Sequence, residues 1–175
     1  SSLVGSEMCI RDRTNRVSVL STGLNIDPIV VVQKAVPGLY SDISSVEIDT
    51  YLAETAAALT VEHPDYSYLA ARIKVNSLHK ETPGFIIATK NLYDDGLLRE
   101  DYYKKVMENA DLIESVIDYD KDYTFDYFAL TTLIRAYLLK FDNKTIERPQ
   151  DLWMRVTLTV TGNEFNLDKI KETYK

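Results

Sequence analysis

The chain has 175 residues, which is enough for one domain or two small ones. Hydrophobic residues make up 45% of it and charged residues 27%, as in soluble globular proteins. No apolar run approaches the roughly 18 residues of a membrane span. The net charge of −7 is uneven, because residues 93–126 hold 11 acidic and 4 basic side chains. This acidic stretch argues against unassisted nucleic-acid binding, and we interpret it as a solvated face.

The chain contains one cysteine, Cys9, and two histidines, His63 and His79. These residues are too few for a disulfide framework or a zinc site, so we expect no metal site. A chain almost free of cysteine suits a reducing compartment, and we expect a cytoplasmic location. The N-terminus lacks the apolar core of a signal peptide.

Residues 1–13, SSLVGSEMCIRDR, differ in character from the rest of the chain. They show no amphipathic period, and they closely resemble the translation of a sequencing adapter. We therefore exclude them from fold reasoning, as one excludes a cloning scar. We expect disorder or an arbitrary helical extension here, and well-packed Leu3, Val4 and Ile10 would contradict that expectation.

Two short helices are predicted next. The first carries an apolar stripe at helical spacing and ends near Gly23. The stripe consists of Val17, Leu20 and Leu24. Asp27 and Pro28 suit the N-cap and first position of the second helix, which covers residues 29–36. The valines of this segment favour a strand as the competing prediction.

Residues 44–82 hold two helical patterns joined by one tight break. Ser44 and Glu47 have the spacing of a capping box at the start of the first helix. Pro64 disfavours helical geometry in His63 and suits the first turn of the second helix. Both helices carry apolar stripes, and Thr-Pro-Gly at 82–84 marks the exit. The stripes are Ile48, Leu52, Ala56 and Leu59, then Tyr66, Leu69, Ala70, Ile73, Ser77 and Leu78.

The polar ends of this helical hairpin admit two interpretations. An antiparallel pair brings the start of the first helix close to the end of the second. Helix N-terminal amides and a lysine hold phosphate, and a carboxylate holds a hydroxyl or ring nitrogen, so the set suits a nucleotide. The simpler interpretation, which spacing alone favours, is helix capping and complementation of the helix dipoles. The residues are Ser44, Ser45, Glu47 and Asp49 at one end and His79 and Lys80 at the other.

Between residues 90 and 119 we expect a short acidic helix at 93–106 and a second helix at 107–117. An apolar stripe along them is interpreted as core. It consists of Val106, Ala110, Ile113 and Ile117. Residues 119–126 alternate aromatic and acidic side chains, which indicates an interaction strip or, better, a turn with half-buried tyrosines.

The last third of the chain is predicted to form a helix, a hairpin and two further helices. The first helix is predicted at 127–137, with Phe128, Leu130, Leu133, Ile134 and Tyr137 facing inward. Residues 138–141 and 145–147 flank Asp-Asn-Lys, which predicts a β-hairpin. Helices are then predicted at 150–160 and from 167 onward. The last has no C-cap signal, so we expect a truncated chain.

A series of short stretches, taken in order, resembles the large (α) subunit of eukaryotic-type class I ribonucleotide reductase. They are GLYS at 38–41, VEIDT at 46–50, AETAA at 53–57, HPDY at 63–66, LAARI at 69–73 and LHKET at 78–82. They continue with YDKDY at 119–123, YLLK at 137–140, ERPQ at 147–150 and ETY at 172–174. The resemblance covers nearly everything after Arg13, and so many ordered matches are highly specific.

The resemblance implies an ATP-cone, the domain that senses ATP against dATP in that family. It favours a helix at 29–36. A β-cap precedes the helical bundle in the family, and adapter-like residues stand in its place here. Arg16 matches the family's arginine on the first helix, Ser45 its hydroxyl position and Asp49 the aspartate that helps to separate ATP from dATP. Lys80 matches its lysine near the end of the hairpin, so the expected effector is ATP or dATP, with Mg²⁺.

The resemblance also implies which chemistry is missing. The family abstracts a ribose hydrogen with a thiyl radical and uses a cysteine pair, a glutamate and an asparagine. It places those residues downstream of Lys175, and no cysteine follows Cys9. We therefore expect no catalytic residue in this chain and no activity from it alone. The acidic runs lack the glycine and glutamate of an EF-hand loop, and no phosphate-binding glycine loop occurs.

We expect a mainly α fold in three parts. Residues 1–13 are adapter-like and disordered, residues 14–90 form a four-helix ATP-cone bundle without its β-cap, and residues 91–175 begin a second helical layer with one short β-hairpin. The parent would be a ribonucleoside-diphosphate reductase that makes deoxyribonucleotides for DNA replication. Its partners would be other large subunits and the radical-generating small subunit, with no nucleic acid and no membrane.

Two alternatives remain open. ATP-cones also occur as nucleotide-sensing modules in transcription repressors, but those carry a zinc ribbon, and no zinc-ligand set is visible here. A purely structural helical interaction domain would explain the periodicity but not the ordered motifs. The reading frame beyond Lys175 would discriminate between the enzyme and these alternatives.

Overall fold

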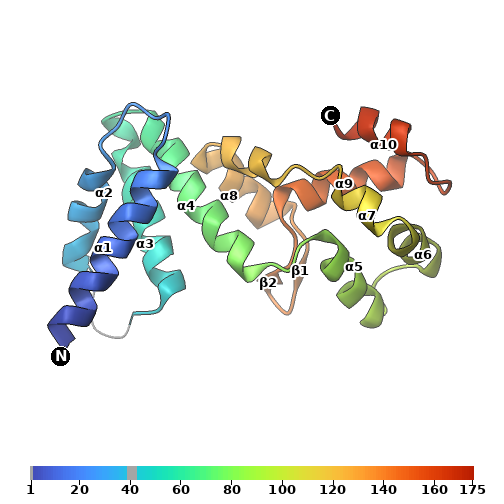
Figure 1. The fold of residues 1–175 in the computed structure, drawn as a ribbon, viewed down its shortest axis with the longest axis horizontal. Helices are drawn as coiled ribbons and strands as arrows, with labels where there is room; N and C mark the ends of the chain where they lie inside the picture. The colour runs from blue at the N-terminus through green and yellow to red at the C-terminus, as the bar shows by residue number, and fades with distance from the viewer. Residues whose placement is uncertain (1, 39–42) are drawn as a thin grey trace. The chain divides into compact units, whose positions relative to one another are not determined.

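A computed structural model of the chain describes residues 2–38 and 43–175, with side chains described from residue 11 onward. The regular elements of these residues are helices, apart from one two-stranded hairpin (Figure 1). The predicted mainly α fold class is confirmed. None of the described helices combines the length and apolar character that a membrane crossing needs.

The chain packs as two compact units that are each built from two segments. The first unit comprises residues 1–77 and 123–131, and the second comprises residues 78–122 and 132–175. Two helices contribute to both units, namely α4 (Asp65–Glu81) and α8 (Tyr127–Ala136). The boundaries predicted after residues 13 and 90 concern homologous domains rather than packing, and they stay predictions.

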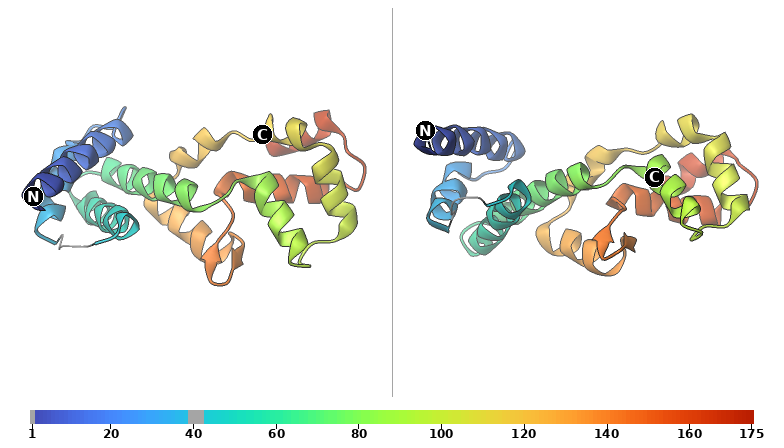
Figure 2. Two further views of the ribbon diagram at one scale, coloured as in Figure 1. Left: turned by 60° about the horizontal axis from the view of Figure 1, so that its bottom comes forward. Right: turned by 90° about the horizontal axis from the view of Figure 1, so that it is seen from below.

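The first unit is a bundle around one apolar core. Its other helices are α1 (Ser2–Leu20), α2 (Pro28–Ala35) and α3 (Ser45–Ala58), with short 3₁₀ turns η1 (Val36–Gly38) and η2 (Leu59–Val61). Helix α2 packs against both α1 and α3 (Figure 2). The predicted hairpin stripes lie on the buried side, which confirms the helical period. The core consists of Val17, Val31, Val32, Ala35, Ile48, Leu52, Ala53, Ala56, Leu59, Tyr66, Leu69, Ala70 and Ile73.

Local signals fix where α2 and α3 begin. Asp27 caps α2, because its Oδ1 accepts a hydrogen bond from the Ile29 N–H at 2.9 Å, and Pro28 opens the helix. Helix rather than strand is therefore correct for this valine-rich segment. The capping box of α3 is present as predicted: the Glu47 N–H donates to Ser44 Oγ at 3.2 Å, and the Ser44 N–H donates to Glu47 Oε2 at 2.9 Å.

The adapter-like segment is part of α1. The helix begins at Ser2, so of the two expected outcomes the helical extension is found and disorder is not. No proline interrupts it, and each residue added to an existing helix adds one backbone hydrogen bond. The predicted lack of packing at Leu3, Val4 and Ile10 lies outside the described side chains. Arg13, the last residue of the segment, lies 3.8 Å from Asp49 and is 11% exposed, so it contacts the bundle.

The second unit packs short helices around its own core. Its elements are α5 (Phe85–Asp94), α6 (Glu100–Glu108), α7 (Ala110–Glu114), the 3₁₀ turn η3 (Tyr119–Thr124), β1 (Lys140–Phe141), β2 (Lys144–Thr145), α9 (Pro149–Val160) and α10 (Leu167–Tyr174). The main core draws on α5, α6, α7, α9 and α10. It consists of Phe85, Val106, Ile113, Met154, Leu158, Ile170 and Tyr174. The stripe predicted through Val106 and Ile113 is therefore core, as expected.

Two predictions are wrong here: one concerns the bounds of a helix, and the other concerns which side chains face inward. The helix predicted at 93–106 is interrupted, because α5 ends in a Schellman motif at Gly96, which has φ +73°. The Leu97 N–H donates to the Leu92 carbonyl at 2.9 Å there, which closes the helix end. Phe128 on α8 and Tyr137, which directly follows that helix, are 79% and 60% exposed rather than inward, because the apolar stripe is wider than the buried face.

The predicted hairpin is present but shorter. Strands β1 and β2 pair antiparallel in the register Lys140 with Thr145 and Phe141 with Lys144. Asp142 and Asn143 have φ of +49° and +60°, as the two central residues of a type I′ turn require. Asp and Asn tolerate this left-handed backbone better than other side chains, which explains the sequence of the turn.

The capping box predicts a stability loss at Ser44. Ser44→Ala removes the acceptor for the Glu47 N–H, and we expect the free energy of unfolding to fall by about 1 kcal/mol. Chemical denaturation would measure it. Ser45→Ala is the matched control on the next, exposed residue and should change stability by less than about 0.5 kcal/mol. Equal effects of both changes would contradict a specific cap.

Candidate functional site

The first candidate site lies where α1 faces the start of α3. Arg16 Nη1 lies 3.3 Å from both carboxylate oxygens of Asp49, and Arg13 Nη1 lies 3.8 Å from Asp49 Oδ1. The Asp49 side chain is only 5% exposed. A buried carboxylate is stable when it is paired and hydrogen-bonded; Arg16 supplies the hydrogen bonds, and Arg13 adds a second positive charge at 3.8 Å. Two of the four predicted nucleotide-binding residues are thus brought together.

The other two predicted residues stand differently. Ser45 is the exposed first residue of α3, one turn before Asp49 on the same helix. Lys80 is exposed in the last turn of α4 and belongs to the second unit. The four-residue set of Arg16, Ser45, Asp49 and Lys80 therefore stays a prediction. The competing capping interpretation is realised at the neighbouring Ser44 and Glu47.

Ionisation at this helix start follows the cap geometry. The Ser44 side chain and backbone hydrogen-bond to the Glu47 carboxylate and lower its pKa below the ordinary 4.5. Glu47 therefore remains charged in neutral solution and favours the positive end of the α3 dipole.

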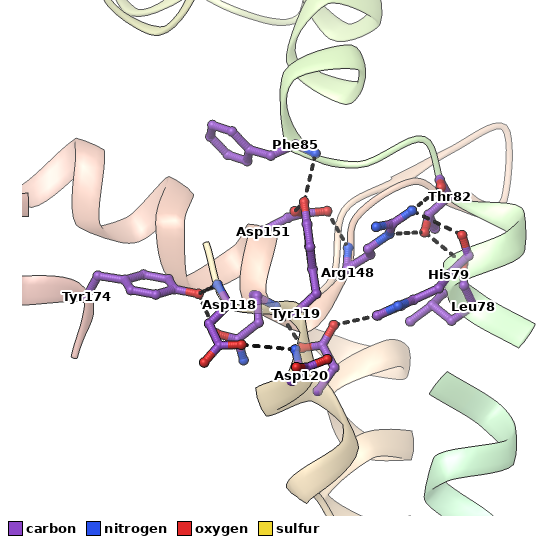
Figure 3. Close-up of polar contacts among 12 residues, drawn as sticks. Leu78, His79, Thr82, Phe85, Asp118, Tyr119, Asp120, Arg148, Asp151 and Tyr174 are labelled. Atoms are coloured by element: carbon purple, nitrogen blue, oxygen red, sulfur yellow. Dashed lines mark hydrogen bonds and ion pairs between the residues drawn. The ribbon is translucent and has the colours of Figure 1, made fainter. Parts of the chain in front are cut away.

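A second polar cluster, in the second unit, was not predicted from the sequence. It is built on the segment Glu147-Arg148-Pro149-Gln150, the ERPQ segment, which leads into α9. Together with Asp122 and Asp151 this segment forms what we call the ERPQ cluster. Arg148 crosses to the end of α4, where its Nε donates to Thr82 Oγ1 at 2.9 Å and its Nη2 donates to the carbonyls of Thr82 at 2.8 Å and His79 at 3.0 Å (Figure 3). Its guanidinium also lies 4.8 Å from the centroid of the Tyr119 ring.

Asp122 forms the second centre of this cluster. It is fully buried, and its Oδ2 lies 2.7 Å from Nε2 of His79. Its Oδ1 accepts a hydrogen bond from the Gln150 N–H at 3.1 Å. The side chain of Gln150 in turn accepts from the Tyr174 hydroxyl at 2.7 Å. The turn η3 is thereby tied to the end of α4, to α9 and to α10.

Asp151 is the third centre. The Tyr119 hydroxyl donates to its Oδ1 at 2.6 Å, and the Arg148 N–H donates to its Oδ2 at 2.9 Å (Figure 3). The same hydroxyl accepts from the Phe85 N–H at 3.2 Å, which anchors the start of α5. Burial raises the pKa of Asp151 to about 6, and the hydrogen bonds from Tyr119 and Arg148 oppose part of that rise.

Glu147 completes the ERPQ segment. Its Oε1 and Oε2 accept from Nε and Nη2 of Arg155 at 2.7 and 3.2 Å, and Oε2 also accepts from the Leu139 N–H at 2.9 Å. The carboxylate raises the pKa of Arg155 above its ordinary value. The bidentate pair joins the hairpin to α9. Among the described side chains, residues 11–38 and 43–175, no cluster of His, Cys, Asp and Glu could hold a metal ion.

This second cluster is architectural. Its acidic groups are satisfied mainly by donors from other elements, and its contacts hold the end of α4 and the starts of α5 and α9. A signal was present in the sequence, because three strongly polar residues surround Pro149 immediately before an apolar helix. Spacing along the chain could not show that the partners of Arg148 are 66 to 69 residues away, or that Gln150 contacts Asp122 and Tyr174.

The role of Arg148 predicts a large stability loss. Arg148→Ala would leave the carbonyls of His79 and Thr82 without their donor, and unpaired buried acceptors cost about 1–3 kcal/mol each. We expect the free energy of unfolding to fall by about 3 kcal/mol in urea titrations. Arg99→Ala is the control, since the Arg99 side chain is 83% exposed in a surface pair with Asp101. A loss of under 1 kcal/mol for Arg148→Ala would contradict the assignment.

The raised pKa of Asp151 predicts a pH dependence. Between its ordinary pKa of 3.8 and the folded value of about 6, the folded chain holds a proton that the unfolded chain lacks. The Asp151 contribution to the free energy of unfolding therefore increases as pH falls from 7 to 4, by at most about 3 kcal/mol at roughly 1.4 kcal/mol per pKa unit. Asp151→Asn should remove this component. Parallel pH profiles of both proteins would contradict the shift.

The comparisons with known proteins give a consistent picture. Residues 123–175 match the family described as "Ribonucleotide reductase, all-alpha domain". Over 92% of its length the chain is 39% identical to the ribonucleoside-diphosphate reductase large subunit of Caenorhabditis elegans and to large chain 2 of Saccharomyces cerevisiae. It is 38% identical over the same share to the large subunit of Arabidopsis thaliana. The chain spans about a fifth of the length of these relatives, from 20% to 22%.

Proposed function

From the premise that this chain is homologous to ribonucleoside-diphosphate reductase large subunits, we propose that it is the N-terminal regulatory part of such a subunit. The homology extends over 92% of the chain and therefore includes both structural units. The all-alpha match begins at residue 123, where the chain enters its last third.

The parent protein would reduce ribonucleoside diphosphates to deoxyribonucleotides by cysteine radical chemistry. This chain would supply no catalytic group, since its one cysteine, Cys9, lies in the adapter-like segment. Its partners would be other large subunits and the radical-generating small subunit, in the cytoplasm. The architectural character of the ERPQ cluster supports this division, because it builds a scaffold and not a reaction centre.

The regulatory part of the proposal is that the first unit is an ATP-cone that binds ATP or dATP. The observation that carries it is the Arg16–Asp49 pair beside the capped start of α3. Guanidinium groups and helix N-terminal amides suit phosphate oxygens, and a carboxylate suits the N–H or hydroxyl of a nucleoside. The residues present therefore fit a nucleotide, with Mg²⁺ held mainly by its phosphates.

Charge balance at the pair indicates how discrimination would work. Asp49 neutralises much of the positive charge of Arg16, and Asp12 lies 3.4 Å from the same guanidinium. The pair therefore offers directed donors and acceptors rather than a strong net charge. A pair of this kind can tell a ligand that carries a hydroxyl group from one that lacks it. Its small net charge attracts phosphate only weakly. Asp49 would be the group that separates ATP from dATP, and Ser45 would contribute at the phosphates.

Calorimetry tests this proposal. Residues 1–13 are replaced by the N-terminal segment of the Caenorhabditis elegans relative, and the protein is titrated with Mg·ATP and Mg·dATP. We expect saturable binding of both nucleotides, and a measurable ratio between the dissociation constants for dATP and ATP. Asp49→Asn removes a negative charge beside the ligand, so binding should persist while the ratio moves toward one.

The control is Glu54→Gln, an exposed acid further along α3, which should leave the ratio unchanged. No binding of either nucleotide would overturn the ATP-cone assignment. Binding with an unchanged ratio in Asp49→Asn would remove Asp49 from the discriminating role.

A further inference from the structure

The second unit contains a small cavity whose wall includes a buried hydroxyl group. The cavity has a volume of about 20 Å³ and lies among α5, α6, the hairpin and α9. A water molecule needs roughly 10–15 Å³ of such volume. The space therefore admits one water-sized molecule and nothing larger.

The hydroxyl belongs to Tyr102 on α6. Its Oη is buried and has no hydrogen-bond partner among the residues that the structure describes. Burial raises the pKa of Tyr102 well above its ordinary value, so the group remains a neutral O–H donor. A buried donor without a partner costs free energy, and such groups in native proteins usually bind ordered water.

Acceptors line the same cavity. The Glu147 carboxylate has room for about four hydrogen bonds and uses three, two from Arg155 and one from the Leu139 N–H. Thr89 donates its hydroxyl proton to the Phe85 carbonyl, which leaves its oxygen able to accept. Tyr102, Glu147 and Arg155 all line this one small cavity, which brings the three groups to the same space.

We propose that the cavity binds one water molecule, which accepts a hydrogen bond from Tyr102 Oη and donates one to the Glu147 carboxylate. Tyr102 and Arg155 also line a groove of about 420 Å³ on the same unit, so they separate the cavity from that groove. The water joins α6 to the Glu147–Arg155 pair. It therefore extends the ERPQ cluster to a helix that the cluster does not otherwise reach.

The alternative is a dry cavity, since several of its lining residues, including Phe85, Ala88 and Leu92, are apolar. The two cases predict opposite effects of Tyr102→Phe. If water is bound, the change removes the group that donates a hydrogen bond to it. We then expect the melting temperature of the full chain to fall by roughly 2–4 °C. If the cavity is dry, removing an unpaired hydroxyl should leave the melting temperature unchanged or raise it, which would overturn the proposal.

Tyr103→Phe is the matched control on the next residue. The Tyr103 ring stacks on Tyr93 with centroids 3.9 Å apart and does not line the cavity, so its melting temperature should not change. A high-resolution crystal structure of the unaltered chain gives an independent test that does not depend on the variant folding. Ordered water within hydrogen-bond distance of both Tyr102 Oη and Glu147 supports the proposal, and its absence overturns it.

Discussion

Capture of helix C-terminal carbonyls by distant cationic side chains organises both units. The last carbonyls of an α-helix have no intrahelical donor, and they carry the negative end of the dipole. Arg72 donates to the carbonyls of Leu20 and Thr22 after α1, at 2.8 and 2.9 Å. Arg148 does the same at the end of α4, and Lys105 at the end of α9, where it donates to Leu158 and Gly162. Each contact joins segments about 50 residues or more apart, so these few cations define the tertiary arrangement within each unit.

The two polar clusters use charge in different ways. In the ERPQ cluster the acids are buried, and each is held by donors from several elements, which suits a scaffold. At the start of α3 one buried acid is shared by arginines at 3.3 and 3.8 Å, next to an exposed serine and an exposed helix start. The arrangement at α3 leaves its helix start exposed to solvent, whereas the ERPQ cluster is closed by contacts from several elements. The proposed regulation is accordingly assigned to the first unit.

Sequence reasoning succeeded where structure is local. Asp27, Ser44 and the Asp142-Asn143 turn act through neighbours no more than three residues away, so their roles were predictable. The apolar stripes of α3 and α4 were also predictable, because burial along these helices follows the helical period. The Schellman motif at Gly96 was missed although its glycine was visible, since acidic helical residues on either side suggested continuity. The contacts of the ERPQ cluster could not be predicted from the sequence, because they depend on tertiary packing and not on spacing along the chain.

The two-segment construction of the first unit has a consequence for modular exchange. Residues 123–131 return to this unit, where the Tyr123 carbonyl accepts from Arg72 at 3.4 Å and the Tyr127 N–H donates to Ser67 at 3.1 Å. A gene fusion or recombination that transplanted only the first 90 residues would deprive Arg72 and Ser67 of these partners and uncover the core beside Tyr127. Successful transfer of the first unit to another protein would therefore have to carry both segments, or replace the second with an equivalent helix.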